Sequence, residues 1–342
     1  MTNIKRRTFL RNLAAASGAP LLAGGLPSFS GPGTPSAPPL TRFKLGVISD
    51  ELSKDFEEAL KTMKSYGLSW VEIRTVWGTY NTEASPEQLQ RIKDPLEKFQ
   101  FKVSVLDTAL FKCALPGTKP VAGGKDAYPY AGQMDLLKRA MDRAPTLGTD
   151  KLRVFAFYRV AEPESRYSQI AEELSKAAEL ALSGGMRLVL EDEGSCNVAT
   201  GHELAEMLKR VPAANFGANW DVGNGVSHGE VSYPDGYAAL DKKRIWHMHI
   251  KDIRCGAAAT SKEFAEAFKK KKERVVEKSK CHTAIVGAGQ VDLLGQLRAL
   301  LRNNYQGTMS LEPEYEAPGL THFEATRRSL VALLRLMAHA AG

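Results

Sequence analysis

Ionisable side chains end four apolar runs in the second half of this 342-residue chain. They are Glu191, Asp221, the pair His247 and His249, and Glu312. The steps from Glu191 to Asp221, to His249 and to Glu312 are 30, 28 and 63 residues long. One strand and its following helix occupy about 30 residues, so this spacing predicts that the side chains lie at the ends of neighbouring parallel strands. We therefore expect them to converge on one site.

A site with three carboxylates requires a compensating positive charge, because carboxylates a few ångströms apart raise one another's pKa. Two glutamates, one aspartate and one histidine form an oxygen-rich donor set. That set suits Mn²⁺, Mg²⁺ or Co²⁺ better than a thiolate-preferring metal. We expect Glu191, Asp221, His249 and Glu312 to hold one divalent metal, with Mn preferred and Mg, Co or Zn as alternatives. Any one of them alone is more often structural, as a helix-cap neighbour or a core histidine; their common register favours the metal site.

Short apolar runs alternate with amphipathic helical stretches from Phe43 onward. One such stretch, Tyr167–Leu182, places Ile170, Leu174 and Ala178 on one face. The eight runs expected to be strands are Lys44–Ile48, Trp70–Arg74, Lys102–Leu106, Leu152–Phe157, Arg187–Leu190, Phe216–Trp220, Ile245–Ile250 and Thr308–Leu311. This alternation predicts an α/β fold, a single (β/α)8 TIM barrel with parallel strands. An open doubly wound sheet is the alternative, but no Gly-x-Gly-x-x-Gly motif follows the first strand.

The first forty residues are expected to be a leader, and the barrel is expected to occupy residues 41–342. Arg6 and Arg7, followed by Phe9, Leu10 and a weakly apolar run, are typical of a twin-arginine signal peptide. A Pro/Ser/Gly-rich linker follows it. We expect export through the twin-arginine pathway, to the periplasm or elsewhere outside the cytoplasm, with a disordered basic tail as the alternative. We expect no membrane partner after export, because no other stretch reaches spanning length.

The net charge of +7 does not indicate a nucleic-acid partner, because it is confined to two segments. Residues 1–40 carry four cations and no acid, and residues 261–280 carry eight cations and four glutamates. This Lys-rich insertion in the barrel is interpreted as a solvated helix, or as a lid over an anionic substrate. The four cysteines form no Cys-x-x-Cys pair, and we expect buried or idle thiols, although an oxidising compartment leaves disulfides open.

The motifs taken together resemble the xylose-isomerase-like superfamily of sugar isomerases and epimerases, over nearly all of residues 43–340. The motifs are Leu190-Glu191-Asp192-Glu193, Trp220-Asp221-Val222-Gly223-Asn224, His247-Met248-His249-Ile250-Lys251-Asp252 and Ser310-Leu311-Glu312, with support from Val71-Glu72-Ile73-Arg74 and Val286-Gly287-Ala288-Gly289. The resemblance implies that Glu191, Asp221, His249 and Glu312 are metal ligands. It also implies that Glu191 and Glu312 form the catalytic acid/base pair.

The chemistry of an isomerase or epimerase requires two such carboxylates. One removes a proton next to a carbonyl and gives an enediolate, whose charge the metal holds, and the other returns a proton. The sequence does not assign which glutamate removes the proton. It departs from many members of the superfamily at Asn224, where they have a histidine, and at Asp192-Glu193, where they have Asn-His. A related branch has similar motifs, so these positions mark a branch and leave the exact reaction open.

Five further residues are candidates for substrate binding, and each has a structural alternative. They are Glu193, Asn224, His247, Lys251 and Arg153. His247 is equally suited to a positioning or packing role, Lys251 to an ion pair with a carboxylate, and Arg153 to a buried pair with Glu72 below the site. A tryptophan beside the end of a barrel strand, such as Trp220, more often packs against the core than stacks on a sugar.

The leading functional hypothesis is a divalent-metal-dependent isomerase or epimerase that acts on a small sugar or glycoside. A lyase that cleaves 3-oxo-glycosides at the same site is the alternative. A hydrolytic nuclease of the apurinic-site type would need a histidine-rich metal cluster, and the chain has only seven histidines. A non-catalytic exported sugar-binding protein is the hypothesis of a different class. A homo-oligomer is compatible with a barrel of this size, but the sequence identifies no interface.

Overall fold

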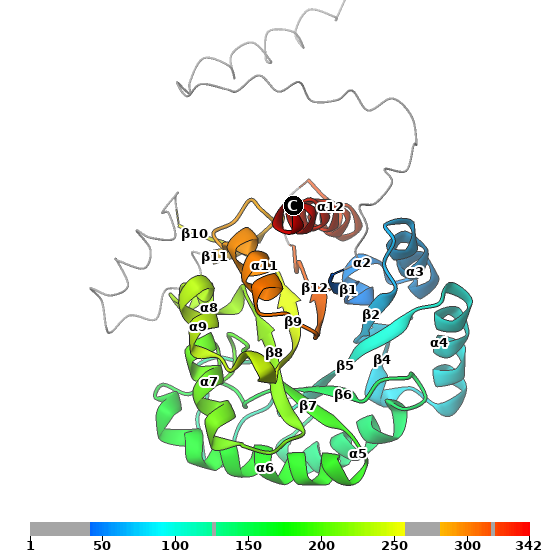
Figure 1. Ribbon diagram of the computed structural model, residues 1–342. Helices are drawn as coiled ribbons and strands as arrows, with labels where there is room; N and C mark the ends of the chain where they lie inside the picture. The colour runs from blue at the N-terminus through cyan, green and yellow to red at the C-terminus, as the bar shows by residue number, and fades with distance from the viewer. Residues whose placement is uncertain (1–41, 125–127, 257–280, 316–318) are drawn as a thin grey trace, which may run out of the picture. The chain divides into compact units, whose positions relative to one another are not determined.

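A computed structural model describes residues 42–124, 128–256, 281–315 and 319–342. Its eight-stranded sheet is parallel throughout and has the order β1-β12-β9-β8-β7-β6-β5-β2 (Figure 1). The strands are β1 Lys44–Val47, β2 Trp70–Ile73, β5 Lys102–Leu110, β6 Lys151–Val154, β7 Arg187–Glu191, β8 Phe216–Asp221, β9 Ile245–Ile250 and β12 Thr308–Leu311. A parallel bridge between Ile48 and Glu72 joins the two ends of the sheet into a nearly closed barrel. The predicted (β/α)8 fold is confirmed.

Helices surround the strands and cover their apolar outer face (Figure 1). They are α2 Ser49–Leu52, α3 Phe56–Ser65, α4 Pro86–Phe99, α5 Gln133–Arg143, α6 Tyr167–Ser183, α7 Gly201–Arg210, α8 Asn224–Ser227, α9 Tyr237–Ala239, α11 Leu293–Arg302 and α12 His322–Ala341. The predicted face of α6 is buried, with Ile170, Leu174 and Ala178 all at 0% exposure. Each long helix therefore packs through the stripe that its sequence period predicts.

Side-chain hydrogen bonds fix the starts of several helices. Asp55 accepts hydrogen bonds from the backbone N–H groups of Glu57 and Glu58 at the start of α3. Ser85 and Gln88 form a capping box at the start of α4. Thr200 caps α7, directly after the loop that follows the Glu191 strand. These caps satisfy backbone donors that have no partner inside the helix, and so they set where each loop at the top of the barrel must end.

Strand alternation separates an apolar exterior from a polar interior. In β9, Met248 and Ile250 belong to the apolar core, while His247 and His249 belong to the opposite face and bind polar groups from other strands. The same period of two places polar residues inside the barrel on β2, β6, β7, β8 and β12. This interior is a column of polar side chains, and its upper end forms the site described below.

Two short hairpins were not expected from the sequence. One pairs β3 Thr75–Val76 with β4 Thr79–Tyr80, and the other pairs β10 Asp252–Cys255 with β11 Cys281–Ala284. In the second hairpin Cys255 and Cys281 form a disulfide, so the expectation of four unpaired thiols is wrong. Opposed positions of an antiparallel pair bring two cysteines close enough to bond, and that pairing is invisible at a separation of 26 residues. Cys113 and Cys196 are buried and do not take part in this disulfide.

The predicted leader at 1–40 and the Lys-rich insertion at 261–280 both lie outside the described residues. In the part of the chain that is described, none of the helices has both the length and the hydropathy that a membrane span requires.

Two of the four cysteines are expected to react with a thiol reagent when the unreduced protein is unfolded, and all four after reduction. The disulfide closes a segment with a separation of 26 residues, which corresponds to about 3.5 kcal/mol of stabilisation in the chain-entropy model. Reduction should therefore lower the melting temperature of the wild type by several degrees and leave a Cys255→Ser/Cys281→Ser variant unchanged. Four reactive thiols without reduction would contradict the disulfide.

Candidate active site

The four predicted ligands lie together at the carboxyl ends of β7, β8, β9 and β12. Glu191, Asp221, His249 and Glu312 are buried, and one ligand atom from each lies within 4.8 Å of the others. His249 Nδ1 is 3.2 Å from Glu191 Oε1, 3.0 Å from Glu312 Oε2 and 3.8 Å from Asp221 Oδ2. The predicted convergence is confirmed, and the ligand role stays a prediction.

The chemistry of this cluster fits a divalent cation. Three carboxylates and one imidazole are a donor set that Mn²⁺, Mg²⁺, Co²⁺ and Zn²⁺ all accept. Within the described part of the chain, the buried atoms Asp221 Oδ2 and Glu312 Oε2 accept no well-aligned hydrogen bond, and the cation beside both is the Lys251 ammonium at 3.0 Å. Buried oxygens that accept no hydrogen bond are costly unless a cation holds them. Both atoms belong to the cluster and face His249.

A second carboxylate below the cluster fixes the orientation of His249. Glu72 Oε1 lies 3.2 Å from His249 Nε2, and Glu72 Oε2 lies 2.8 Å from His247 Nε2. His247 Nδ1 in turn lies 2.7 Å from Thr308 Oγ1. Burial opposes ionisation of Glu72, but the two imidazoles outweigh it and lower the pKa of this carboxyl. His249 thus presents Nε2 to Glu72 and Nδ1 to the three other candidate ligands.

Each of the two catalytic candidates is bound to an arginine. Glu191 Oε2 lies 2.9 Å from Arg153 Nη1, and Glu312 Oε1 lies 3.5 Å from Arg74 Nη1. In both glutamates the other carboxylate oxygen faces His249 Nδ1. In each glutamate, one carboxylate oxygen therefore binds an arginine, and the other oxygen is directed into the centre of the site.

These arginines also pair with three other acids. Arg153 contacts Asp107 Oδ1, and Arg74 lies 3.0 Å from Asp50 Oδ2 and 2.5 Å from Glu51 Oε1. Burial raises the pKa of Asp107 to about 8, although Arg153 lowers it. The positive charge available to the two catalytic candidates is thus shared with other carboxylates.

Lys251 lies between the cluster and the mouth of the barrel. Its Nζ is 3.0 Å from both Asp221 Oδ2 and Glu312 Oε2, and 2.8 Å from Glu314 Oε2. Burial opposes its charge, but the three carboxylates outweigh burial and raise the pKa of Lys251 well above its usual value. Burial likewise raises the pKa of Asp221 to about 7, and Lys251 opposes that rise. In Glu312 the opposite balance holds, because Lys251 and His249 outweigh burial and lower its pKa.

The predicted substrate-binding residues fall into two groups. Glu193 and Asn224 are partly exposed near the cluster, which agrees with a substrate role but does not test it. Glu193 accepts hydrogen bonds from the Ser195 N–H at 3.0 Å and Ser195 Oγ at 2.8 Å and lies 3.6 Å from Lys112. Burial opposes its charge, yet these partners hold the pKa of Glu193 at about 2. Asn224 Nδ2 donates to the Asp192 carbonyl oxygen at 2.8 Å.

The other group is buried, and its members use their polar atoms inside the protein. Both ring nitrogens of His247 are engaged, which favours the positioning role over substrate contact. Arg153 lies in a buried ion pair, as its alternative predicts, although its partners are Asp107 and Glu191, not Glu72. Lys251 likewise pairs with carboxylates. Trp220 is a packing residue that stacks on Tyr237 at a centroid distance of 5.3 Å.

Three charged residues near the site were not singled out from the sequence. Arg74 shares the inward face of β2 with Glu72, and this period of two is a signal that could have identified it. Lys112 and Glu314 lie in loops beyond β5 and β12, so no strand pattern identifies them. Glu314 adopts a positive φ of 42°, and its backbone N–H donates to Glu51 at 3.2 Å. This strained backbone turns the Glu314 side chain back toward Lys251.

Comparison with known proteins agrees with this geometry. The family model described as a xylose isomerase-like TIM barrel matches residues 60–335. Among curated proteins, an inosose dehydratase of Clostridium tetani is 27% identical over 156 residues, which are 45% of this chain and 49% of the relative. The chain therefore spans about half the length of the curated relatives it matches.

Solved structures share the fold at low identity. The IolI protein with a bound zinc atom superposes with a TM-score of 0.64 and 18% identity, over 87% of this chain and 99% of that one. The 3-keto-D-glucoside 4-epimerase YcjR of E. coli gives a TM-score of 0.57 and 15% identity, over 86% and 99% of the two chains. At these identities the similarity establishes the barrel and not the reaction.

Replacing Arg153 by Met should destabilise the protein by about 3–5 kcal/mol, because it leaves Asp107 and Glu191 without their buried partner. The matched control is Arg210→Met, which removes an exposed ion pair with Glu206 and should cost less than about 1 kcal/mol. Urea denaturation measures both values. An Arg153→Met variant as stable as the control would show that the buried pair does not stabilise the fold.

Proposed function

The chain belongs to the xylose isomerase-like TIM barrel family, and on that premise we propose that it is a divalent-metal-dependent isomerase or epimerase. Its substrate would be a keto-sugar or a related polyhydroxy ketone, free or in a glycoside, and the reaction would remove a proton next to the carbonyl. One observation carries the proposal. Glu191 and Glu312 come from β7 and β12, on either side of β8 and β9, and each directs one oxygen toward His249 Nδ1.

The metal would be held by Glu191, Asp221, His249 and Glu312, with Mn the first choice and Mg, Co or Zn as alternatives. When bound, a divalent cation supplies positive charge for the substrate oxygens on which negative charge develops. The donor set and the convergence of its four buried side chains within 4.8 Å support this assignment.

Glu191 and Glu312 are the acid/base pair in this proposal. A carboxylate that takes a proton from carbon must be held in place without losing its free oxygen. The arginines do this, since Arg153 holds Glu191 Oε2 and Arg74 holds Glu312 Oε1. The remaining oxygens approach the site from two strands, so one removes the proton and the other returns it to the opposite face or to the neighbouring carbon. Glu193 and Asn224 would bind substrate hydroxyls at the mouth.

Elimination is the second candidate, and the curated relatives favour it, because they are named inosose dehydratases. A dehydratase or a lyase that cleaves 3-oxo-glycosides begins with the same proton removal and then expels a group from the next carbon. Lys251 Nζ lies 3.0 Å from Glu312 Oε2, and the three neighbouring carboxylates keep the Lys251 amine protonated. An elimination would place the leaving oxygen on this side of the site.

Export is proposed on separate grounds. The paired Arg6 and Arg7 precede Phe9 and Leu10, and the Cys255–Cys281 disulfide suits an oxidising compartment. Twin-arginine export carries folded proteins, so the metal would be bound in the cytoplasm. This location makes free sugars and glycosides more plausible substrates than sugar phosphates.

Elemental analysis of the purified protein should find about one equivalent of divalent metal. Asp221→Asn should reduce the metal affinity more than about tenfold, because a charged ligand is lost. Asp135→Asn on the exposed face of α5 is the matched control and should retain the metal. If neither protein binds metal after incubation with Mn²⁺, the enzyme proposal fails and a non-catalytic sugar-binding barrel becomes the better interpretation.

Glu191→Gln and Glu312→Gln should each slow α-proton exchange of the substrate in D₂O by at least about 100-fold. Proton NMR of a panel of ketoses and 3-oxo-glycosides measures the exchange, and the exposed Glu172→Gln is the control. Exchange with an epimer or isomer as product supports the leading proposal, whereas an unsaturated product or a released aglycone identifies elimination. Full exchange in both glutamine variants would exclude this acid/base pair.

Cell fractionation tests export. The wild type should appear outside the cytoplasm with its leader removed, and an Arg6→Lys/Arg7→Lys variant should remain in the cytoplasm at full length. Equal export of the two proteins would show that the arginine pair does not direct it.

A further inference from the structure

The amino ends of the barrel strands form a cavity at the opposite end from the candidate active site. Its volume is about 600 Å³, which lies in the range of small-molecule sites. It is lined by the first residues of six strands, which are Lys44, Trp70, Lys151, Arg187, Ile245 and Thr308. The barrel strands therefore place polar or charged side chains at both of their ends.

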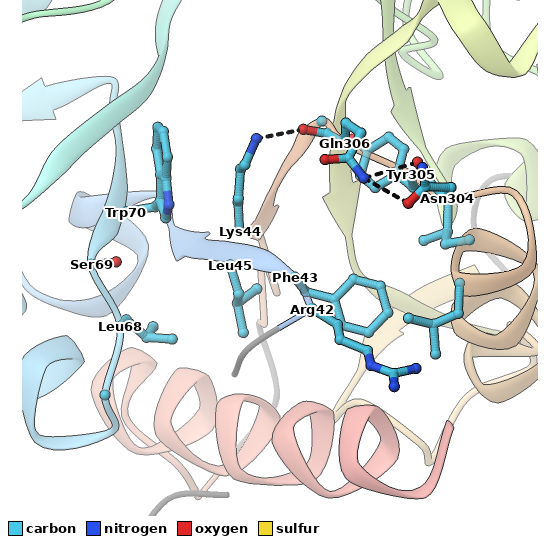
Figure 2. Close-up of a pocket in the computed structure, with 14 residues that line it drawn as sticks. Arg42, Phe43, Lys44, Leu45, Leu68, Ser69, Trp70, Asn304, Tyr305 and Gln306 are labelled. Carbon is cyan, nitrogen blue, oxygen red and sulfur yellow. Dashed lines mark hydrogen bonds between the residues drawn. The ribbon is translucent and has the colours of Figure 1, made fainter. Parts of the chain in front are cut away.

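The lining of this basal cavity is strongly cationic. Lys242 and Lys243 join Lys44, Lys151 and Arg187, and none of its lining residues is acidic. A second cavity of about 520 Å³ adjoins it, shares Lys44 and Trp70, and adds Arg42. Figure 2 shows Lys44 and Trp70 side by side, with Lys44 Nζ reaching the Gln306 carbonyl oxygen at 2.8 Å.

Most of this positive charge is not neutralised by the protein. Arg187 and Lys151 share one acid, Asp150, at 2.6 Å and 3.6 Å. The side-chain hydrogen bonds of Lys44 and Lys242 go to carbonyl oxygens, Lys242 Nζ also lies 4.5 Å from the Tyr237 ring centroid, and Asp241 attracts Lys242 from nearby. Ion pairs of Lys44, Lys242 or Lys243 are absent from the described ranges. A hydrogen bond to a neutral carbonyl holds an ammonium group in place without removing its charge.

The cations are also close enough to repel one another. Lys151 has a side chain that is only 13% exposed. Burial lowers the pKa of Lys151, and Arg187 and Lys44 lower it further, whereas Asp150 acts against this. The loss of hydration and the repulsion between neighbours are both relieved when an anion enters.

Two tryptophans, Trp70 and Trp246, also line the cavity. Lys102 Nζ lies 5.6 Å from the centroid of the Trp70 ring, and Arg187 lies 5.5 Å from that of Trp246. The Trp246 ring nitrogen donates to the Lys243 carbonyl oxygen at 3.1 Å, which fixes the ring beside that lysine. These rings hold the cations in a defined geometry, and they report on the cavity by their fluorescence.

We propose that the basal cavity is a binding site for a small anion with two or more negative charges, of the phosphate or carboxylate class. Lys44, Lys151 and Lys243 would contact the anion, and the Arg187–Asp150 pair would form one side of the site. The ligand occupies the end of the barrel away from Glu191 and Glu312, so the proposal does not depend on the reaction proposed above.

Titration of the full-length protein with inorganic phosphate, and separately with succinate, tests this site by calorimetry and tryptophan fluorescence. Titrations of the protein before and after EDTA treatment, with the EDTA removed, separate binding at this cavity from binding to a metal in the candidate active site. In about 150 mM salt, where exposed charges are screened, we expect one saturable site with a Kd below about 1 mM for at least one probe. Phosphate binding without succinate binding would support the site and narrow the ligand to phosphates.

Lys44→Gln and Lys243→Gln should each weaken binding about tenfold or more. Lys243 is exposed, so its variant is expected to fold even if Lys44→Gln is unstable. Lys138→Gln on α5, whose side chain is 63% exposed, is the matched control and should bind like the wild type. Glu312→Gln should also bind like the wild type, because it alters only the other end of the barrel. Saturable binding of neither probe, or equal weakening in Lys138→Gln, would overturn the proposal.

Discussion

The structure depends on the burial of many carboxylates in the upper half of one barrel. Glu72, Asp107, Glu191, Asp221 and Glu312 are all less than 3% exposed. Taking even one carboxylate out of water costs several kcal/mol unless a partner compensates it. The arrangement of the surrounding side chains follows from this cost. Arg153, Arg74 and Lys251 each bind two or more carboxylates, and Glu72 holds two imidazoles.

The period of two along each strand makes this burial compatible with a stable fold. Residues such as Met248, Ile250, Met309 and Leu311 face the helices and build the apolar core. The alternate positions are then free to be polar without weakening that core. Because parallel strands run in one direction, residues at equal height around the barrel act as a layer. Along β9 the inward positions place His247 beneath His249, and along β7 they run from Arg187 at the basal cavity to Glu191 in the ligand layer.

The amino-acid sequence alone predicts the features that depend on this strand period of two. All eight strands follow from the apolar runs. The convergence of Glu191, Asp221, His249 and Glu312 follows from the four runs that end on ionisable residues. The structure differs where loops decide the outcome. The Lys251–Glu314 pair depends on a left-handed backbone at Glu314, and the Cys255–Cys281 bond depends on a hairpin of four-residue strands. Neither contact follows a repeating sequence pattern, so residue propensity and spacing cannot identify either of them.

The balance of charge in the site argues for a resident cation more strongly than any single ligand does. Arg74 is shared by Asp50, Glu51 and Glu312, and Arg153 is shared by Asp107 and Glu191. Lys251 is shared by Asp221, Glu312 and Glu314. Three cations therefore serve seven carboxylates, since Arg74 and Lys251 share Glu312.

Protonation relieves part of this excess, since burial raises the pKa of Asp107 to about 8 and that of Asp221 to about 7. Proton uptake at Asp221 would remove a charged ligand, whereas a divalent ion would keep the carboxylate ionised and add two positive charges at the same place. At the other end of the barrel the imbalance has the opposite sign, because Lys44, Lys242 and Lys243 form no ion pair within the described ranges and no acid lines the cavity. One fold thus keeps an excess of negative charge where it would hold a metal and an excess of positive charge where it would hold an anion, with the polar column between them.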